Sequence, residues 1–282
     1  MTNNSDTEIA DGTIVSSVLL DAPAPGLSLH EMTYKSGNLH VKGYLLVPGG
    51  GGPYPGLLYC RGGIGGFGMV RMNHAAALAA KGYAVFAPFY RGSASGEGID
   101  KFGGEDRFDV YNAFKLMRSL PDVVTSAPIA LAGFSRGAIM ALLAARDCAD
   151  AGPAAVWNGV SDLLLTYEER VDLRRMLKRV VGHPGKNREA YEDRSPHIWA
   201  DRIRKPVLIV HGTSDDNVGV AHSRLLADAL ERAGAKYKLE LFEGLGHLFP
   251  PEAEARAIHA IDEWFASHRA ADLPQGSSTN SP

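Results

Sequence analysis

The chain has 282 residues, of which 45% are hydrophobic and 22% are charged, and its formal net charge is −3. This composition is typical of a soluble globular protein, and it excludes the strongly basic surface that nucleic-acid binding requires. The first residues, MTNNSDTEIADGT, lack the basic start and apolar core of a signal peptide, and no apolar run reaches the ~18 residues that cross a bilayer. We therefore expect a cytoplasmic protein that binds neither nucleic acid nor membrane.

The two ends of the chain are polar, rich in turn formers and without periodicity. We expect disorder in residues 1–12 and 271–282, and one folded domain over residues 13–270. The two cysteines, Cys60 and Cys148, fall in apolar runs, which predicts that both are buried and reduced.

The domain begins with a predicted antiparallel hairpin, formed by the β-rich runs LSLHEMTYKSG and LHVKGYLLVPG. Helical spacing then alternates with short apolar runs, and the helical spacing is clearest at residues 110–117, 226–233 and 258–265. Most of the apolar runs predict strands that are buried on both faces; the runs are PGLLYC, YAVFAPFY, PIALAGFS, AAVWNGV, PVLIVHG and YKLELFEG. This alternation predicts an α/β protein with a mostly parallel, doubly wound sheet.

One segment, about residues 161–204, interrupts the alternation. It carries a predicted helix with apolar residues from Leu173 to Val180, followed by the irregular stretch GHPGKNREAYEDRSPH. An insertion of this length in an α/β unit usually covers a site, so we expect a short helical cap.

Two groups of charged residues accompany these elements. Arg91, Glu105 and Asp109 are interpreted as an ion-pair cluster that braces a loop beside the site. The cap helix carries five basic residues, which we expect to form a solvated face, with carboxylate binding as the alternative: Arg170, Arg174, Arg175, Lys178 and Arg179.

The stretch LAGFSRGAIMALLAA contains the motif G-x-S-x-G at Gly133, Ser135 and Gly137. The motif follows an apolar strand and opens an apolar helix, which is the context in which it marks a nucleophilic serine on a tight turn. The N-terminus of the following helix favours developing negative charge. We therefore expect Ser135 to be a nucleophile.

A serine of this kind needs an acid and then a histidine later in the chain, each directly after a strand. PVLIVHG is followed by Asp215 and Asp216, and YKLELFEG is followed by His247. We expect His247 to take the proton from Ser135, and one of the two adjacent aspartates to fix its tautomer. His211 is expected to stabilise the acid loop by hydrogen bonding.

A metal centre is the less favoured interpretation of the same residues, His211, Asp215, Asp216 and His247. No paired spacing such as H-E-x-x-H occurs, and the serine motif would remain unexplained. We therefore expect no metal ion.

The stretch YCRGGIGGFG fits two interpretations. Its glycines match the G-x-G-x-x-G of a dinucleotide turn, and Arg91 would suit the 2′-phosphate of NADP. A dinucleotide turn also needs an acidic residue about 20 positions on, and none occurs from Ile64 to Gly96. We therefore expect no cofactor and instead an oxyanion hole, formed by the backbone N–H groups of Arg136 and Gly63, with Gly62 beside them.

Together these pieces resemble the α/β-hydrolase fold and, more narrowly, the catalytic domain of the prolyl oligopeptidase (S9) family. The matching motifs lie within about residues 40–270: RGGIGGFG, YRGSASGEG, GFSRG, YEDRSPH, HGTSDDNV and GLGH. In that family the first acid of HGTSDDNV belongs to the triad, so the resemblance implies Asp215 rather than Asp216. The family's peptidases carry an N-terminal β-propeller that restricts access, whereas only about 40 residues precede the hydrolase core here.

We therefore expect a serine hydrolase that uses Ser135, Asp215 and His247 to cleave carboxylic esters of small acyl substrates through an acyl-enzyme. The first alternative is a peptidase that acts on short peptides or acyl-amino acids. The second is a non-catalytic binding protein, which the presence of all three residues disfavours. The biological substrate stays open, as does the oligomeric state, with a homo-oligomer as one option.

Overall fold

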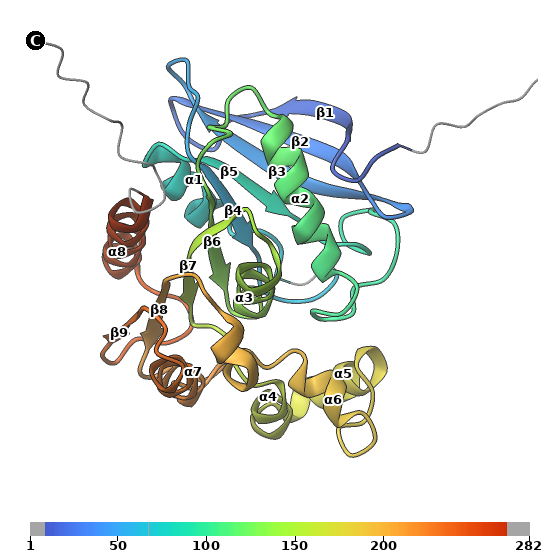
Figure 1. The fold of residues 1–282 in the computed structure, drawn as a ribbon, viewed down its shortest axis with the longest axis vertical. Coiled ribbons are helices and arrows are strands. Elements are labelled where there is room, and N and C mark those ends of the chain that lie inside the picture. The colour runs from blue at the N-terminus through green and yellow to red at the C-terminus, as the bar shows by residue number, and fades with distance from the viewer. Residues whose placement is uncertain (1–8, 67, 270–282) are drawn as a thin grey trace, which may run out of the picture.

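The computed structural model describes residues 9–66 and 68–269, which form a nine-stranded sheet with helices on both faces (Figure 1). The strand order is β1-β2-β3-β5-β4-β6-β7-β8-β9. The pairs β1/β2, β2/β3 and β3/β5 are antiparallel, and all other neighbours in the sheet are parallel. The predicted α/β class, with a mostly parallel doubly wound sheet, is confirmed.

The N-terminal part of the sheet is antiparallel. The predicted hairpin is confirmed as β2 (Leu27–Ser36) and β3 (Leu39–Pro48). The edge strand β1 (Ile14–Leu20) was not predicted from the sequence. Its sequence, IVSSVLL, has no period of two, because most of its side chains are exposed on both faces of the sheet edge.

The six predicted parallel strands are present: β4 (Gly56–Cys60), β5 (Ala84–Pro88), β6 (Ile129–Phe134), β7 (Ala151–Trp157), β8 (Val207–Gly212) and β9 (Tyr237–Phe242). The central ones are buried at every residue. The run AAVWNGV was predicted as strand to its end, and this is wrong for its last three residues. Asn158 adopts a left-handed φ of 47° and turns the chain out of the sheet.

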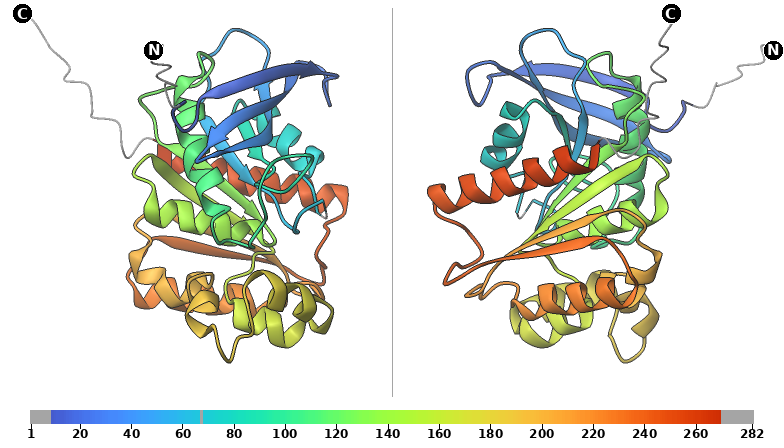
Figure 2. Two further views of the ribbon diagram at one scale, coloured as in Figure 1. Left: turned by 90° about the vertical axis from the view of Figure 1, so that its right-hand side faces the viewer. Right: turned by 60° about the vertical axis from the view of Figure 1, so that its left-hand side comes forward.

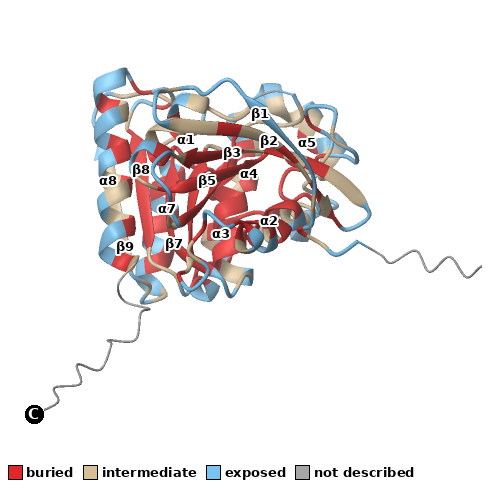
Figure 3. Ribbon diagram, turned by 90° about the horizontal axis from the view of Figure 1, so that it is seen from above, coloured by how far each residue is buried: buried red, intermediate tan, exposed pale blue. Residues whose placement is uncertain are grey.

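Helices cover the two faces of the sheet (Figure 2). One face carries α1 (Met72–Ala80) and α8 (Pro251–Arg269), and the other carries α2 (Arg107–Ser119), α3 (Gly137–Asp147) and α7 (Ala221–Arg232). In the view from above, the buried strands lie between exposed helix surfaces (Figure 3). Each helix turns an apolar stripe to the sheet, as the helical spacing predicted.

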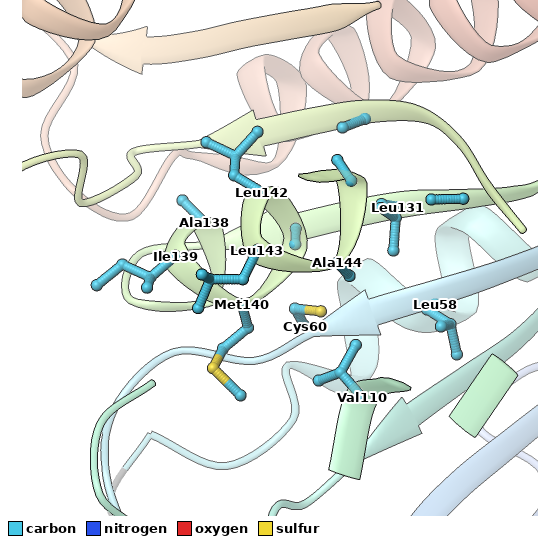
Figure 4. Packing of buried hydrophobic residues seen from close by; sticks show 14 of the residues in the cluster. Leu58, Cys60, Val110, Leu131, Ala138, Ile139, Met140, Leu142, Leu143 and Ala144 are labelled. Carbon is cyan, nitrogen blue, oxygen red and sulfur yellow. The ribbon is translucent and has the colours of Figure 1, made fainter. Parts of the chain in front are cut away.

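The central helix α3 packs on β4 and against α2 (Figure 4). Met140, Leu143 and Ala144 of α3 are fully buried, and so is Cys60 at the end of β4. Cys60 is therefore buried as predicted, whereas Cys148, just after α3, is only half-buried. Both cysteines carry free thiols.

The insertion between β7 and β8 is more helical than predicted. It contains α4 (Leu163–Glu169), the 3₁₀ helix η1 (Val171–Leu173), α5 (Arg174–Val180), α6 (Arg188–Glu192) and the 3₁₀ helix η2 (Pro196–Arg202). The expectation of irregular chain after one helix is therefore wrong for residues 188–192 and 196–197. Those helices are too short for a periodic pattern to reveal them. In Figures 1 and 2 the helices α4 to α6 gather at the end of the molecule far from β1.

The ends of the described chain also differ from expectation. The N–H group of Gly12 donates to the carbonyl of Lys35, and Asp11 accepts from the N–H group of Gly37. The expected disorder of residues 1–12 does not extend to these two. Of the other residues in that expectation, 1–8 and 271–282 lie outside the described residues. In the part of the chain that the structure describes, no helix is long and apolar enough to cross a membrane.

The contact between α3 and β4 generates a prediction about stability. A Cβ atom on Gly137 would overlap the carbonyl group of Cys60, which is backbone and cannot rotate away. We expect Gly137→Ala to lower the free energy of unfolding by about 3 kcal/mol, the upper end of the usual cost of overpacking, measured by urea denaturation. The control is Gly66→Ala, where a Cβ meets nothing within 4 Å. Equal stabilities of the two variants would contradict the prediction.

Candidate active site

Ser135 lies at the turn between β6 and α3 with a left-handed backbone, φ 57°. This conformation is rare for a residue with a side chain and is typical of strain at functional sites. The two motif glycines allow the turn to close. A Cβ on Gly133 would lie 2.5 Å from the Gly137 carbonyl oxygen, and one on Gly137 would overlap the Cys60 carbonyl. The motif therefore requires glycine at these two positions because backbone atoms lie too close for a side chain.

The glycine loop lies directly beside Ser135. It leaves the carboxyl end of β4, which pairs in parallel with β6, so the two loops meet above the sheet. Because the chain passes from β4 to β5 on one side and returns to β6 on the other, β4 is a topological switch point, where α/β sheets bind ligands. A Cβ on Gly62 would lie 3.0 Å from Ser135 Cβ. The first turn of α3 contains no acidic residue to oppose an anion there.

Asp215 follows β8, is buried, and is fixed on both carboxylate oxygens. One oxygen accepts from the N–H groups of Asn217 (2.8 Å) and Val218 (2.9 Å), and the other lies 2.7 Å from His247 Nδ1. Burial opposes ionisation, but the interactions with His247 and the two N–H groups outweigh it and hold the pKa of Asp215 below its ordinary value. The charged carboxylate therefore favours a His247 ring protonated at Nδ1.

His247 follows β9 and lies in a loop held by Asn158. The Asn158 amide donates to the His247 carbonyl (2.8 Å) and accepts from the N–H group of Gly212 (2.9 Å). The His247 ring lies 5.0 Å from the Phe134 ring and lines the same cavity as Ser135. Among the described residues, no hydrogen bond joins this ring to Ser135 Oγ. Such contacts are often long without substrate and shorten when it binds.

The structure brings Asp215, and not Asp216, to His247. Asp216 is exposed. The helix α7 begins at Ala221, and no side chain, that of Asp216 included, caps its first turn.

His211 stabilises the acid loop, as predicted. Its ring is fully buried, with Nε2 2.8 Å from the Val218 carbonyl oxygen and Nδ1 2.6 Å from Ser223 Oγ. Burial is the main cause that lowers the pKa of His211, so the ring is neutral and ties the end of β8 to α7. Within residues 9–66 and 68–269, no group of three or more His, Cys, Asp or Glu side chains is arranged to hold a metal ion.

Two buried arginines hold the glycine loop by its carbonyl groups. Arg61 donates to the carbonyls of Gly62 (2.8 Å) and Gly65 (3.1 Å). Arg136 donates to the carbonyl of Gly63 (2.7 Å). Because N–H and C=O point in opposite directions in a trans peptide, the bond to the Gly62 carbonyl turns the N–H group of Gly63 away from Arg61. The peptide that carries the expected oxyanion donor is therefore fixed.

Two buried acids neutralise these arginines. Asp100 binds Arg136 through two contacts of 2.7 Å and lies 3.7 Å from Arg61, and Asp106 also accepts from Arg136. Burial opposes the charge on Asp100, but the charge and hydrogen bonds of Arg136 outweigh it and hold the pKa of Asp100 below its ordinary value. Arg136 was expected to act only through its backbone N–H group, and the network of its side chain was not predicted from the sequence.

The ion pair predicted beside the site is present between Arg91 and Asp109. Arg91 Nη2 lies 2.7 Å from Asp109 Oδ1, which also accepts from Ser36 (2.7 Å). The pair braces the chain after β5, as expected. Glu105 does not belong to it and contacts Lys101 instead (3.3 Å).

Ser135, His247 and the glycine loop line one cavity of about 650 Å³, a size typical of small-molecule sites. The insertion contributes part of the wall and so covers the site, as predicted. Most of the wall is apolar and includes Ile64, Phe102, Val160, Leu173, Met176 and Leu248.

The basic residues of the insertion do not form one solvated face. Three of them are exposed, as predicted: Arg175, Lys178 and Arg179. Arg174 is half-buried over the ring of Tyr167. Arg170 lines the cavity, where it binds Asp172 (2.7 Å) and the backbone carbonyl of Asn217 (3.0 Å). The expectation is therefore wrong for Arg170 and Arg174.

A serine on a strained turn after β6, an acid after β8 and a histidine after β9 of such a sheet define an α/β-hydrolase. The chain belongs to the prolyl oligopeptidase family, whose model matches residues 69–271. An uncharacterized peptidase of Bacillus subtilis (strain 168), YtmA, is 42% identical over 245 residues, which cover 86% of this chain and 95% of that protein.

Solved structures share the fold at lower identity. The acylaminoacyl peptidase of Pyrococcus horikoshii has a TM-score of 0.75 at 21% identity, over 86% of this chain and 42% of that one. The acetyl xylan esterase of Paenibacillus sp. R4 has a TM-score of 0.69 at 18% identity, over 88% of each chain. The same fold thus occurs in proteins named as peptidases and as esterases.

The geometry of the two adjacent acids generates a second prediction. Asp215→Asn should reduce kcat about 10⁴-fold, because an amide in place of the carboxylate stabilises the wrong histidine tautomer. Asp216→Asn is the matched control and should change kcat less than about 3-fold, because its side chain is exposed. Steady-state kinetics on an activated acyl substrate compares the two. A larger loss in Asp216→Asn would show that the acid is misassigned.

The buried network generates a third prediction. Asp100→Asn should lower the free energy of unfolding by about 3 kcal/mol at pH 7, because it removes a counter-charge from Arg136. Since folding lowers the pKa of Asp100, its stabilisation is present above about pH 4 and is lost as the pH falls through the folded-state pKa. Urea denaturation from pH 7 to pH 3 should therefore show the difference from wild type shrinking toward acid pH.

The control for this prediction is Glu105→Gln, which removes an exposed acid from the same segment and should change stability by less than about 0.5 kcal/mol. A pH-independent difference for Asp100→Asn would contradict the argument.

Proposed function

We propose that this member of the prolyl oligopeptidase family is a serine peptidase that acts on short peptides and acylated amino acids. The observation that carries the proposal is the contact between His247 Nδ1 and Asp215 at one edge of a cavity that Ser135 also lines. The relative at 42% identity is named a peptidase, which favours amide over ester bonds.

The proposed reaction has two halves. Ser135 Oγ forms a bond to the acyl carbon while His247 Nε2 takes the serine proton. The N–H groups of Gly63 and Arg136 donate to the oxyanion, His247 gives its proton to the leaving nitrogen, and the C–N bond breaks. Water then attacks the acyl-enzyme by the same route and releases the acid, so that Ser135 regains its proton.

The cavity favours an uncharged acyl side. Most of the cavity wall is apolar, and Asp172 is the one acidic side chain among the described lining residues. Asp172 is already bound to Arg170 (2.7 Å), so it does not present a free carboxylate to a peptide α-ammonium group. We therefore expect substrates whose amino end is acylated, and weaker turnover of those with a free amino end.

Ester cleavage is the second candidate function. The structural similarity to an acetyl xylan esterase, which extends over 88% of each chain, favours it. The same nucleophile and oxyanion donors would act on both bond types, and an ester is intrinsically the easier one to cleave. A comparison of N-acylated and free aminoacyl anilides with short esters separates the candidates.

The test of the proposed chemistry is at Ser135. A fluorophosphonate probe should label the wild type at Ser135, and Ser135→Ala should lose both labelling and about 10⁶-fold in kcat. Peptide mapping of the labelled protein locates the adduct. Full turnover in Ser135→Ala, or labelling of another residue, would reject the mechanism. An unlabelled wild type would instead support a non-catalytic binding protein.

A further inference from the structure

Arg71 lines the active-site cavity just before α1. Its guanidinium lies 5.3 Å from the centre of the Phe134 ring, and its Nε donates to His74 Nε2 at 3.2 Å. About a quarter of its side chain is exposed (27%). The chain thus places a cation on the surface of the cavity, with its orientation fixed from behind.

The group behind Arg71 is a neutral histidine. His74 is buried, stacks on Trp157 at 4.4 Å, and has Nδ1 3.2 Å from Tyr59 Oη. Burial, followed by the charge of Arg71, lowers the pKa of His74 to about 3. Because the neutral ring accepts from Arg71 at Nε2, it orients the guanidinium without supplying a counter-charge.

The nearest acid cancels that charge only partly. Glu254 of α8 lies 3.8 Å from Arg71 Nη2, beyond hydrogen-bond distance. Its carboxylate is bound by Asn73 at 2.7 Å and also lies 3.2 Å from His74 Nε2. Within residues 9–66 and 68–269, neither Nη1 nor Nη2 of Arg71 has a hydrogen-bond acceptor. Four N–H groups of a fork that suits a carboxylate therefore remain for a ligand.

The other two arginines that line the cavity are bound to acids. Arg136 is buried and binds Asp100 and Asp106, and Arg170 binds Asp172. Arg71 differs from them because its closest partner is a neutral ring.

Arg71 lies on the histidine side of the reaction centre. Phe134, whose ring it faces, directly precedes Ser135, and the same ring lies 5.0 Å from the ring of His247. Because His247 gives the proton to the departing group, that group leaves on this side. A carboxylate that interacts with Arg71 would therefore belong to the leaving group and not to the acyl group.

We propose that Arg71 binds the free α-carboxylate of the leaving amino acid. This inference rests on the proposed function and narrows it, because the substrates become acylated amino acids or short peptides cut one residue before the C-terminus. The reaction releases that amino acid with its carboxylate on Arg71 and its amino group newly protonated by His247.

The experiment compares two peptides that differ only in this charge. They are N-acetyl-phenylalanyl-alanine and the same peptide with a C-terminal amide, and release of alanine or alaninamide is followed by mass spectrometry. Wild type should prefer the free acid about 10- to 100-fold in kcat/KM, the effect of one charge-assisted pair. Arg71→Met should reduce the preference to about 1, and Arg71→Lys should retain part of it.

The control is Arg175→Met, which removes the same charge from an exposed position outside the cavity and should keep the wild-type preference. Rates are normalised to labelling of Ser135 by an uncharged fluorophosphonate, which reports the intact site in each variant. An equal preference in wild type and Arg71→Met would overturn the inference. So would a labelled wild type that cuts neither peptide, whereas an unlabelled wild type would reject the proposed function itself.

Discussion

The close approach of α3 to β4 is the constraint on which the site depends. Gly137 lies so near the carbonyl group of Cys60 that a single added carbon would overlap it. This contact forces the chain between β6 and α3 into a turn that Ser135 completes at a positive φ. Because β4 continues from Cys60 directly into the glycine loop, the same contact sets the loop beside Ser135. One backbone contact therefore positions both the expected nucleophile, Ser135, and the expected oxyanion donors.

The peptide groups of the glycine loop must also be held in one orientation, and buried charged side chains hold them. Arg61 and Arg136 hold carbonyl groups of the loop, and Asp100 and Asp106 balance the two cations. Burying four charges is costly, and apolar residues of similar volume often give greater stability. The network is therefore better explained by its effect on the orientation of the glycine loop than by its effect on the stability of the protein. A guanidinium fixes several acceptors in one plane, which an apolar side chain cannot do.

The sequence was sufficient to predict those parts of the candidate site that depend on the order of strands and loops along the chain. Ser135, Asp215 and His247 each follow an apolar run, and the fold class follows from the alternation of those runs with helices. The side-chain network could not be predicted, because Asp100 contacts Arg136 across 36 positions and no local pattern records that contact. The role of Asn158 in holding the His247 loop was not predicted, because the apolar run AAVWNGV predicts a strand up to its last residue. The edge strand β1 was missed because its exposed faces impose no alternation.

The charges around the cavity divide it into two unequal sides. On the side of the insertion, Arg170 is bound to Asp172, so the two charges largely cancel. That wall therefore contributes shape and apolar surface but little electrostatic potential. On the side of His247, Arg71 is held by a neutral ring and retains its charge. A substrate with an apolar acyl part and an anionic leaving part fits both sides, and the reverse orientation fits neither. In the proposed reaction the leaving group always departs first, and the acyl group stays on Ser135 until water attacks it. The asymmetry of charge therefore favours substrates whose anionic end lies on the leaving side, next to Arg71.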